Sequence, residues 1–440
     1  MRVLILGSSI PYATHAFKGI TAVNIVSYYL AVSLADAGHE VFYQPLLDLA
    51  IDSQPFENGD YVLQIDGLKD VGIQVLEPVF VENAGKQQPS FRKRMRLLLY
   101  RCPVADFYPV YRVRAKIEKA VRSVNAAAIL NIWSPEGIAA SFGIRHIPKI
   151  AYYGDIDFVP NEIYYLEKDV FGSRNNLGLK HSLLDLLNYI KLKKYKNSHL
   201  KIIKDYDHIG CVTYTNVAKY RELGVSQATY FKNTWYDVFE ALGADCIDWH
   251  RKRRNLTKKV KIIGHVGHLR MTGSSIGLDF LLRKAAPLMR AKLPFAHEIH
   301  IIGGGELRAT LKPFSGAENV VLRGYVDDLE KEFLDADFFF LLNNVGRYNS
   351  AFTRHVIAWS AGQCLVVHRN SVKALPEIDP GVNAIVIDNE VDLAEKLIRV
   401  VEKPDTYYQI RRSGRHTYLG AFQPQQVAAE VLAIINSHIH

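Results

Sequence analysis

The sequence predicts an α/β protein built from two Rossmann-like, doubly wound domains that face each other across a cleft. Three observations predict this fold class. Short apolar runs alternate with helical patterns along most of the chain, as in parallel sheets covered by helices. The same alternation restarts at residue 260, after a polar and basic stretch. The length of 440 residues also exceeds what one hydrophobic core usually fills.

The first half opens with a buried strand, Arg2–Gly7, followed by a helix with apolar residues at helical spacing. Gly38 ends this helix, because glycine readily adopts the left-handed conformation that closes helices. Further strands are expected at 39–43, 127–132, 149–152 and 210–212, and helices at 21–37, 108–123, 179–195 and 216–223. The turn-rich segment 44–89 gives no assignment.

The second half repeats this pattern. Strands are expected at 260–266, 299–302, 320–322, 338–342, 364–367 and 384–387, with a helix at 276–289. The expected division is a first domain at 1–240, a linker at 241–259, a second domain at 260–420 and a C-terminal helix at 421–440. We expect that helix to pack back towards the first domain.

Composition excludes several classes of protein. The four cysteines are far apart and show no Cys-x-x-Cys spacing, which argues against a disulfide scaffold or a zinc ribbon. No apolar run approaches the roughly 18 residues that a transmembrane helix needs. The apolar run at 3–6 is too short for a secretory signal. We therefore expect a cytoplasmic protein.

The formal net charge of +9 is concentrated in three windows, 86–122, 191–204 and 251–261. Such windows favour an anionic partner. In the first window, apolar side chains recur at helical spacing while basic ones occupy the other faces; the residues that would contact a membrane are Phe91, Arg92, Arg94, Met95 and Leu98. This pattern is typical of an interfacial helix on anionic lipid. A helix packed on the domain, or a nucleic-acid contact, would give the same pattern.

Glycines at the end of the strand at 260–266 and just after it predict a phosphate site. A diphosphate needs backbone N–H groups, the positive end of a helix and a nearby cation. Gly264, Gly267 and Gly273 let the chain approach such a group, and Arg270 supplies charge. A plain strand-to-helix turn would explain the same glycines.

A second anion site is expected at 348–354. Asn349 or Ser350 can cap the helix that follows, and Arg354 lies in its first turn. An ordinary cap and a solvated arginine are the alternative.

Polar residues also follow two expected strands of the first domain. Trp133 and Glu136 follow one strand, and Asp155 and Asp157 follow the next. The carboxyl ends of parallel strands share one edge of a sheet, where ligands bind. The three carboxylates are candidate general bases, although turn formation and helix capping also favour acids at such positions.

Five segments resemble, in order, the motifs of the GT-B glycosyltransferases, a family of two-domain enzymes that use nucleotide sugars, and in particular its group 1 members. The segments are 34–41 (LADAGHEV), 264–270 (GHVGHLR), 301–307 (IIGGGEL), 322–329 (LRGYVDDL) and 352–367 (FTRHVIAWSAGQCLVV). The resemblance covers nearly the whole chain.

The resemblance implies a nucleotide-sugar donor held by the second domain and an acceptor held by the first. The donor-binding residues that it implies are Gly267, Arg270, Thr272, Gly304, Tyr325, Asn349, Ser350, Thr353 and Arg354. The acceptor side would include Lys18, Gly19 and Trp133, and Asp155, Asp157 and Glu136 remain the candidates for catalysis. No cofactor and no metal are expected.

The chain departs from the family at one point. Many members carry two glutamates eight residues apart in this region, and the corresponding residues here are Asn349 and Ile357. We expect a glycosyltransferase that acts on a glycan or lipid-linked acceptor in the synthesis of cell-envelope polysaccharide or glycolipid. It would be a cytoplasmic protein bound peripherally to the inner face of the cell membrane. A catalytically degenerate sugar-nucleotide-binding protein and a DNA-modifying glucosyltransferase are the alternatives; nucleic acid is not the expected partner, because no base-reading element is recognisable.

Overall fold

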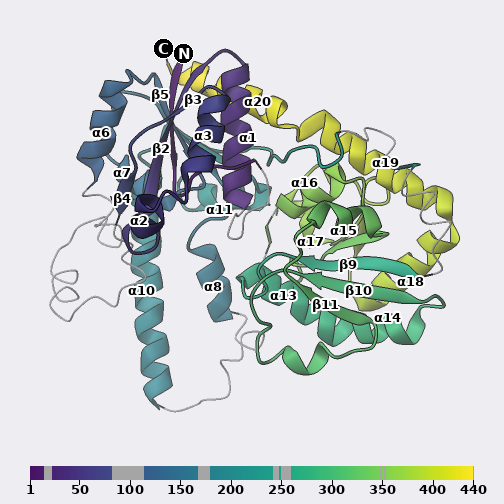
Figure 1. The fold of residues 1–440 in the computed structure, drawn as a ribbon. Coiled ribbons are helices and arrows are strands. Elements are labelled where there is room, and N and C mark those ends of the chain that lie inside the picture. The colour runs from purple at the N-terminus through teal and green to yellow at the C-terminus, as the bar shows by residue number, and fades with distance from the viewer. Residues whose placement is uncertain are drawn as a thin grey trace.

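The computed structural model describes residues 1–13, 22–81, 113–166, 179–240, 247–248, 259–346, 349–350 and 353–439. Within these residues the chain forms two parallel sheets, each with helices packed around it (Figure 1). The first sheet has the order β3-β2-β1-β5-β6-β7-β8, with β4 paired to β2, and the second has the order β11-β10-β9-β12-β13-β14. The predicted fold class of two parallel α/β domains is confirmed.

The elements of the first domain are β1 (Arg2–Gly7), α1 (Ala22–Asp36), β2 (Glu40–Asp48), α2 (Leu49–Glu57), α3 (Val62–Asp70), β3 (Ile73–Val75), β4 (Val79–Val81), α6 (Arg114–Ser123), β5 (Ala128–Ile132), α7 (Pro135–Ala140), β6 (Lys149–Tyr153), α8 (Val159–Leu166), α10 (Leu179–Ile203), β7 (His208–Cys211), α11 (Tyr214–Glu222) and β8 (Ala228–Tyr230).

The elements that follow are β9 (Val260–Val266), α13 (Thr272–Phe280), a π-helical turn (Leu281–Ala285), α14 (Ala286–Lys292), β10 (His297–Ile302), a 3₁₀ turn (Lys312–Phe314), β11 (Val320–Gly324), α15 (Leu329–Asp335), β12 (Phe338–Leu341), α16 (Thr353–Ser360), β13 (Cys364–His368), α17 (Asn370–Ala374), β14 (Ile385–Ile387), α18 (Glu390–Glu402), α19 (Pro404–Ala421) and α20 (Pro424–His438).

Central strands in both sheets are buried and largely apolar because helices cover both of their faces. In β1, all residues after Arg2 are buried, and β1 pairs with β2 on one side and β5 on the other. In the second sheet, β9 likewise lies between β10 and β12. All strand pairs are parallel, and the order in which successive strands are added to each sheet reverses next to β1 and next to β9. This switch point places the loops after these strands at the binding edge.

The structure assigns the segment 44–89 as far as its described residues reach. Strand β2 continues through Pro45 to Asp48, and α2, α3, β3 and β4 follow. Strands of three residues carry too little periodicity to be recognised, and α3 buries only Leu68 among its residues. The expected helix at 276–289 is interrupted by the π-helical turn and starts earlier, at Thr272.

The last two helices connect the domains. Helix α19 contacts the segment that follows β8: the Tyr418 hydroxyl donates to the Trp235 carbonyl at 3.0 Å, and Arg415 donates to both carboxylate oxygens of Asp237 at 2.7 and 2.6 Å. Helix α20 then packs on α1 of the first domain (Figure 1). It also places Glu430 against Lys232.

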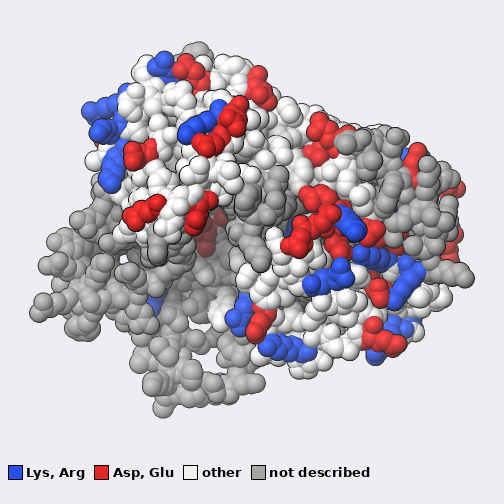
Figure 2. All heavy atoms as spheres, viewed as in Figure 1, with Lys and Arg blue, Asp and Glu red and all other residues white. Residues whose placement is uncertain are grey.

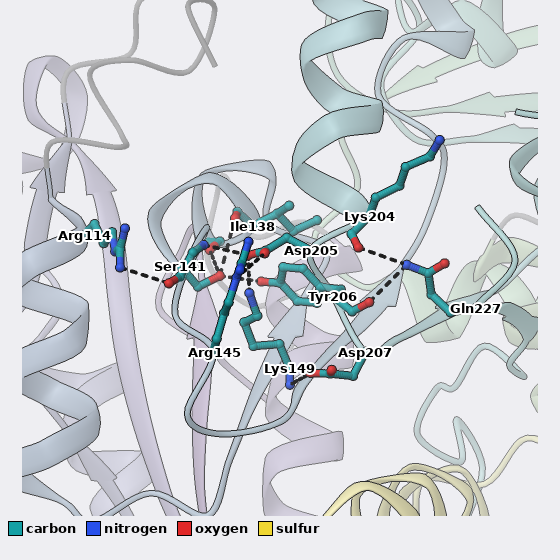
Figure 3. A network of polar contacts seen from close by, with 12 residues as sticks. Arg114, Ile138, Ser141, Arg145, Lys149, Lys204, Asp205, Tyr206, Asp207 and Gln227 are labelled. Carbon is teal, nitrogen blue, oxygen red and sulfur yellow. Dashed lines mark hydrogen bonds and ion pairs between the residues drawn. The ribbon is translucent and has the colours of Figure 1, made fainter. Parts of the chain in front are cut away.

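A buried polar network supports the amino ends of the first sheet, on the edge opposite the strand ends that bear the candidate bases (Figure 3). Lys149 is 1% exposed, and its ammonium donates to Asp205. Its backbone N–H donates to Asp207 at 2.8 Å, and the hydroxyls of Tyr206 and Ser141 share a hydrogen bond of 2.7 Å. Burial lowers the pKa of Lys149, an effect that Asp205 opposes.

Charged side chains of both signs are interspersed on the described part of the face in Figure 2. The excess of basic residues is therefore not concentrated on that part of the surface. None of the helices formed by the described residues has an apolar stretch long enough to cross a bilayer. The window with the expected membrane helix, including Phe91, Arg92, Arg94, Met95 and Leu98, lies outside the described residues.

We expect His208 to make the stability of the protein depend on pH. Burial lowers the pKa of His208 to about 4, and the ring of His438 lies 5.8 Å away. Because protonation favours the unfolded chain, stability is present above the ordinary pKa of about 6.5 and is lost as the pH falls towards 4. The expected loss is on the order of 1–2 kcal/mol, since solvent screens the partly exposed ring.

Urea unfolding of wild type and His208→Gln at pH 7 and pH 4.5 measures this effect. The wild type should lose more stability between the two pH values than the variant loses. Equal losses would show that another group carries the pH dependence.

Candidate functional site

The candidate site lies where loops at the carboxyl ends of both sheets meet. In the first domain these loops follow β5 and β6; in the second they follow β9, β10, β11 and β12. An apolar contact between Ile163 of α8 and Ile276 of α13 also joins the two domains beside these loops.

Trp133 follows β5 in an unusual backbone conformation. Its φ of 46° lies in the left-handed region, which a bulky residue rarely adopts, and such strain is typical of functional sites. Its ring is stacked on Tyr152, with centroids 6.3 Å apart, and a Cβ on Gly154 would lie only 3.3 Å from it. Its indole nitrogen has no hydrogen-bond partner among the described residues.

Glu136 lies in the first turn of α7. Ser134 caps this helix by accepting from the Gly137 N–H at 2.9 Å, and Pro135 takes the first helical position. An acid in a first turn is favoured by the helix dipole, so the position of Glu136 also has a structural explanation.

Asp155 makes a direct contact across the cleft. The Ser350 hydroxyl donates to its carboxylate, and nearby Thr215 of α11 donates to the Asn349 carbonyl at 3.3 Å. The structure thus brings together Asp155, predicted as a candidate base, and Ser350, predicted to bind the donor. The Asn349 side-chain oxygen has no hydrogen-bond partner within the described part of the chain.

Asp157 is only two residues away but lies in a different environment. Its carboxylate accepts from the Tyr153 hydroxyl and faces His199 Nδ1 at 3.3 Å. These partners belong to the first domain, so Asp157 is held within that domain while Asp155 reaches the other one.

Three glycine-containing loops of the second domain are bonded to one another. The Gly267 N–H donates to Ile302 at 3.0 Å, the Leu269 N–H donates to Gly304 at 3.1 Å, and the Gly303 N–H donates to Gly324 at 2.8 Å. A Cβ on Gly303 would lie 1.9 Å from the Gly267 oxygen, so this approach requires glycine. Tyr325, directly after these loops, is 48% exposed.

Thr272 begins α13 at the edge of these loops. No side chain among the described residues caps this helix, whose first N–H groups can therefore meet an anion. Arg270 lies exposed two residues earlier.

Arg308 lies beside the same helix, and the sequence reasoning missed it. Its guanidinium donates to Ser275 at 2.7 Å and to the Arg270 carbonyl at 3.0 Å. Burial lowers the pKa of Arg308; the phenol of Tyr164 opposes this shift and Arg270 adds to it. An anion between two guanidinium groups would stabilise both. Its position one residue beyond the glycine-rich motif was the available signal.

Arg354 joins the start of α16 to the end of β9. Its guanidinium donates to the Val266 carbonyl at 2.8 Å and lies 3.3 Å from His265 Nδ1. Burial, and then Arg354, lower the pKa of His265 well below its usual range. The imidazole is therefore neutral near pH 7 and can accept from Arg354.

Thr353 and Ser350, at the start of α16 and in the loop before it, contact other parts of the chain. Helix α16 begins at Thr353, whose hydroxyl accepts from Asn233 at 3.4 Å. The Ser350 hydroxyl donates to Asp155, and its backbone N–H and carbonyl bind the side chain of Asn344 at 2.9 and 2.8 Å. Asn344 was also missed, although it lies three residues after the end of β12.

Ile357, at the second glutamate position of the family, is 5% exposed and belongs to the hydrophobic core. It cannot hold a ribose from there. Lys18 and Gly19 lie outside the described residues. Among the residues that are described, no three His, Cys, Asp or Glu side chains cluster as a metal site would require.

Comparisons with known proteins agree with the geometry. Residues 260–403 match the family model for glycosyl transferases group 1. No curated protein sequence matches the chain. A glycosyltransferase from Rickettsia africae ESF-5 has a similar structure, with a TM-score of 0.59 at 13% identity over 100% of this chain and 98% of that one.

Two further solved structures are similar. Sucrose-phosphate synthase from Thermosynechococcus elongatus has a TM-score of 0.62 at 12% identity, over 99% of this chain and 98% of that one. HepE from Anabaena, solved in complex with UDP-glucose, has a TM-score of 0.58 at 12% identity, over 99% of this chain and 100% of that one.

The fold is therefore that of the GT-B glycosyltransferases, as the sequence motifs predicted. Residues 260–403 of the second domain match the group 1 glycosyltransferase model, and the similar solved structures show that the whole chain has the fold of these enzymes.

The two arginines that flank the β9 loop should bind a diphosphate. Replacing Arg270 or Arg354 with Ala should each weaken the binding of pyrophosphate by about 1.5–3 kcal/mol, because each removes a charged hydrogen bond. Isothermal titration calorimetry measures the affinity. Arg399→Ala, on the exposed face of α18, is the matched control and should bind like wild type. Unchanged affinity in both site variants would place the diphosphate elsewhere.

Proposed function

We propose that the chain transfers a sugar from a nucleoside diphosphate sugar to a hydroxyl of a glycan or lipid-linked acceptor. The cross-cleft contact between Asp155 and Ser350 is the observation that carries the proposal, since it joins the first domain's candidate base to the loop that would hold the donor. HepE, a structural neighbour, was solved with UDP-glucose, which supports a UDP-sugar as the first donor to test.

In this proposal the diphosphate binds at the N-terminus of α13, near Arg270, Arg308 and Arg354. These groups stabilise the charge of the leaving diphosphate, and no resident metal is required. Tyr325 is exposed beside this site and offers a surface on which a nucleobase can stack. The side-chain oxygen of Asn349 is an acceptor suited to a sugar hydroxyl.

Asp155 is the proposed base. The acceptor oxygen attacks the anomeric carbon, the bond from that carbon to the diphosphate oxygen breaks with its electron pair, and the hydroxyl proton moves to Asp155. A carboxylate accepts several hydrogen bonds, so Asp155 can keep its contact with Ser350 while it takes an acceptor hydroxyl. This route inverts the anomeric configuration.

Asn349 and Ile357 favour a second candidate, a protein that binds sugar nucleotides without transferring the sugar. The buried Ile357 leaves the usual ribose contact unfilled. A thermal-shift screen of nucleotide sugars, followed by assays for nucleotide release, separates the two functions. Stabilisation with release supports transfer; stabilisation without release under every acceptor tested supports binding alone.

Asp155→Asn should lower kcat by about 10²–10⁴-fold, because the amide cannot take the acceptor proton, while donor affinity stays near that of wild type. Steady-state nucleotide release and calorimetry measure the two quantities. Asp66→Asn, an exposed carboxylate of α3, is the matched control. A wild-type kcat in Asp155→Asn would exclude Asp155 as the base.

We also propose that the protein works at the inner face of the cell membrane, in the synthesis of envelope polysaccharide or glycolipid, with the segment 91–101 as an interfacial helix. Its pattern of apolar and basic residues supports this.

Leu98→Asp tests the membrane contact. Flotation with anionic liposomes should weaken in this variant and fall with salt, because the apolar face and the charges both contribute to binding. Leu63→Asp, which changes a 65% exposed leucine of α3, should float like wild type. If the wild type never floats and Leu98→Asp lowers the melting temperature sharply, the segment is instead a helix packed in the core.

A further inference from the structure

The loop that carries Asp155 is contacted at its two ends by helices α11 and α10, which are linked to each other through His199 and Tyr220. At its start, the Gly154 carbonyl accepts from the Asn216 side chain of α11 at 3.1 Å. At its end, Asp157 faces His199 Nδ1 at 3.3 Å, and His199 Nε2 lies 2.8 Å from the Tyr220 hydroxyl. Asn216 and Tyr220 are four residues apart on α11, so they share one helix face.

His199 is the link between Asp157 and α11. Its side chain is 2% exposed on α10, stacked on Tyr220 with ring centroids 5.9 Å apart, and in edge contact with Phe158 at 5.5 Å. A neutral imidazole donates from one nitrogen and accepts at the other. Nδ1 lies 3.3 Å from the Asp157 carboxylate and Nε2 lies 2.8 Å from the Tyr220 hydroxyl, so each ring nitrogen faces a polar partner.

This arrangement leaves Asp155 between two anchored points. Asp157 has a second contact in the Tyr153 hydroxyl at the end of β6, so the loop is anchored to the sheet as well as to α10 and α11. The same helix α11 also reaches the opposite loop, through Thr215 and the Asn349 carbonyl. Helix α11 therefore contacts a loop on each side of the cleft.

We infer that His199 is a positioning residue for sugar transfer, which holds the loop 154–157 through Asp157 so that Asp155 meets the donor loop at Ser350. The inference rests on the proposed function of Asp155 as base. It assigns Asp157 to positioning, where the sequence had offered it as a base. A base displaced by about 1 Å can lose on the order of 10²-fold in rate, so loosening this anchor should act on kcat.

A residue that only supports the fold would lower the melting temperature and leave the chemistry intact. Tyr206 provides the matched control, because its hydroxyl also makes one buried hydrogen bond, to Ser141 at 2.7 Å, in the network at the opposite edge of the sheet (Figure 3). Tyr220→Phe and Tyr206→Phe therefore remove the same group from two buried networks, only one of which reaches the loop.

The experiment compares wild type with His199→Phe, His199→Gln, Tyr220→Phe and Tyr206→Phe, at a temperature well below the lowest melting point. Hydrogen exchange of the amides at 154–158 and the kcat and donor KM for nucleotide release are measured. His199→Phe should speed the exchange and lower kcat by about tenfold or more, with donor KM within about twofold. His199→Gln should recover part of both, since an amide can still donate and accept.

Tyr220→Phe should shift exchange and kcat in the same direction by less, because it removes only the outer bond. Tyr206→Phe should lower the melting temperature alone. If His199→Phe matches Tyr206→Phe in exchange and kcat, or if exchange rises without a loss of kcat, the inference is overturned. If His199→Phe does not fold, the same comparison of exchange and kcat is made between Tyr220→Phe and Tyr206→Phe.

Failure of the proposed function gives a different result. In that case wild type binds no nucleotide sugar or releases no nucleotide, whereas the exchange data still report whether His199 holds the loop. Unchanged exchange in His199→Phe and Tyr220→Phe would overturn the anchor irrespective of activity.

Discussion

The arrangement of the two domains depends on the ion pair between Asp237 and Arg415. Arg415 is 3% exposed and donates to both carboxylate oxygens of Asp237, and a third hydrogen bond goes to the Ser360 carbonyl. Burying an arginine is tolerable only when its charge is paired in this way, and removal of one partner would leave an isolated buried charge. The pair joins the end of the first domain to α19.

Contacts across the cleft are of another kind. Asp155 with Ser350 and Thr215 with Asn349 are single hydrogen bonds, and the apolar contact of Ile163 with Ile276 is small. A buried bidentate pair is stronger than any of these. Such a division, strong near the connection and weak at the mouth, suits an enzyme whose substrates enter between its domains and whose catalytic groups come from both sides.

The sequence predicted the central strands because burial on both faces makes them largely apolar runs, as in β1. It predicted Trp133 and Asp155 as cleft residues because both follow such strands. Segment 44–89 could not be assigned, since its short strands depend on pairing with β2. His199 and Asn216 were missed for a related reason: a polar residue on a helix looks like surface until tertiary packing buries it against a particular loop.

The return of α20 onto α1 has a consequence for biosynthesis. Chain growth proceeds from the N-terminus, so α1 emerges long before residues 424–438, which cover it, have been made. Buried positions along α20, such as Val427, Val431 and Ile435, are contributed only at the end of translation. The first domain therefore exposes apolar surface on the ribosome until synthesis of the second is complete, and a nascent chain that stalls between the two is a natural client for chaperones.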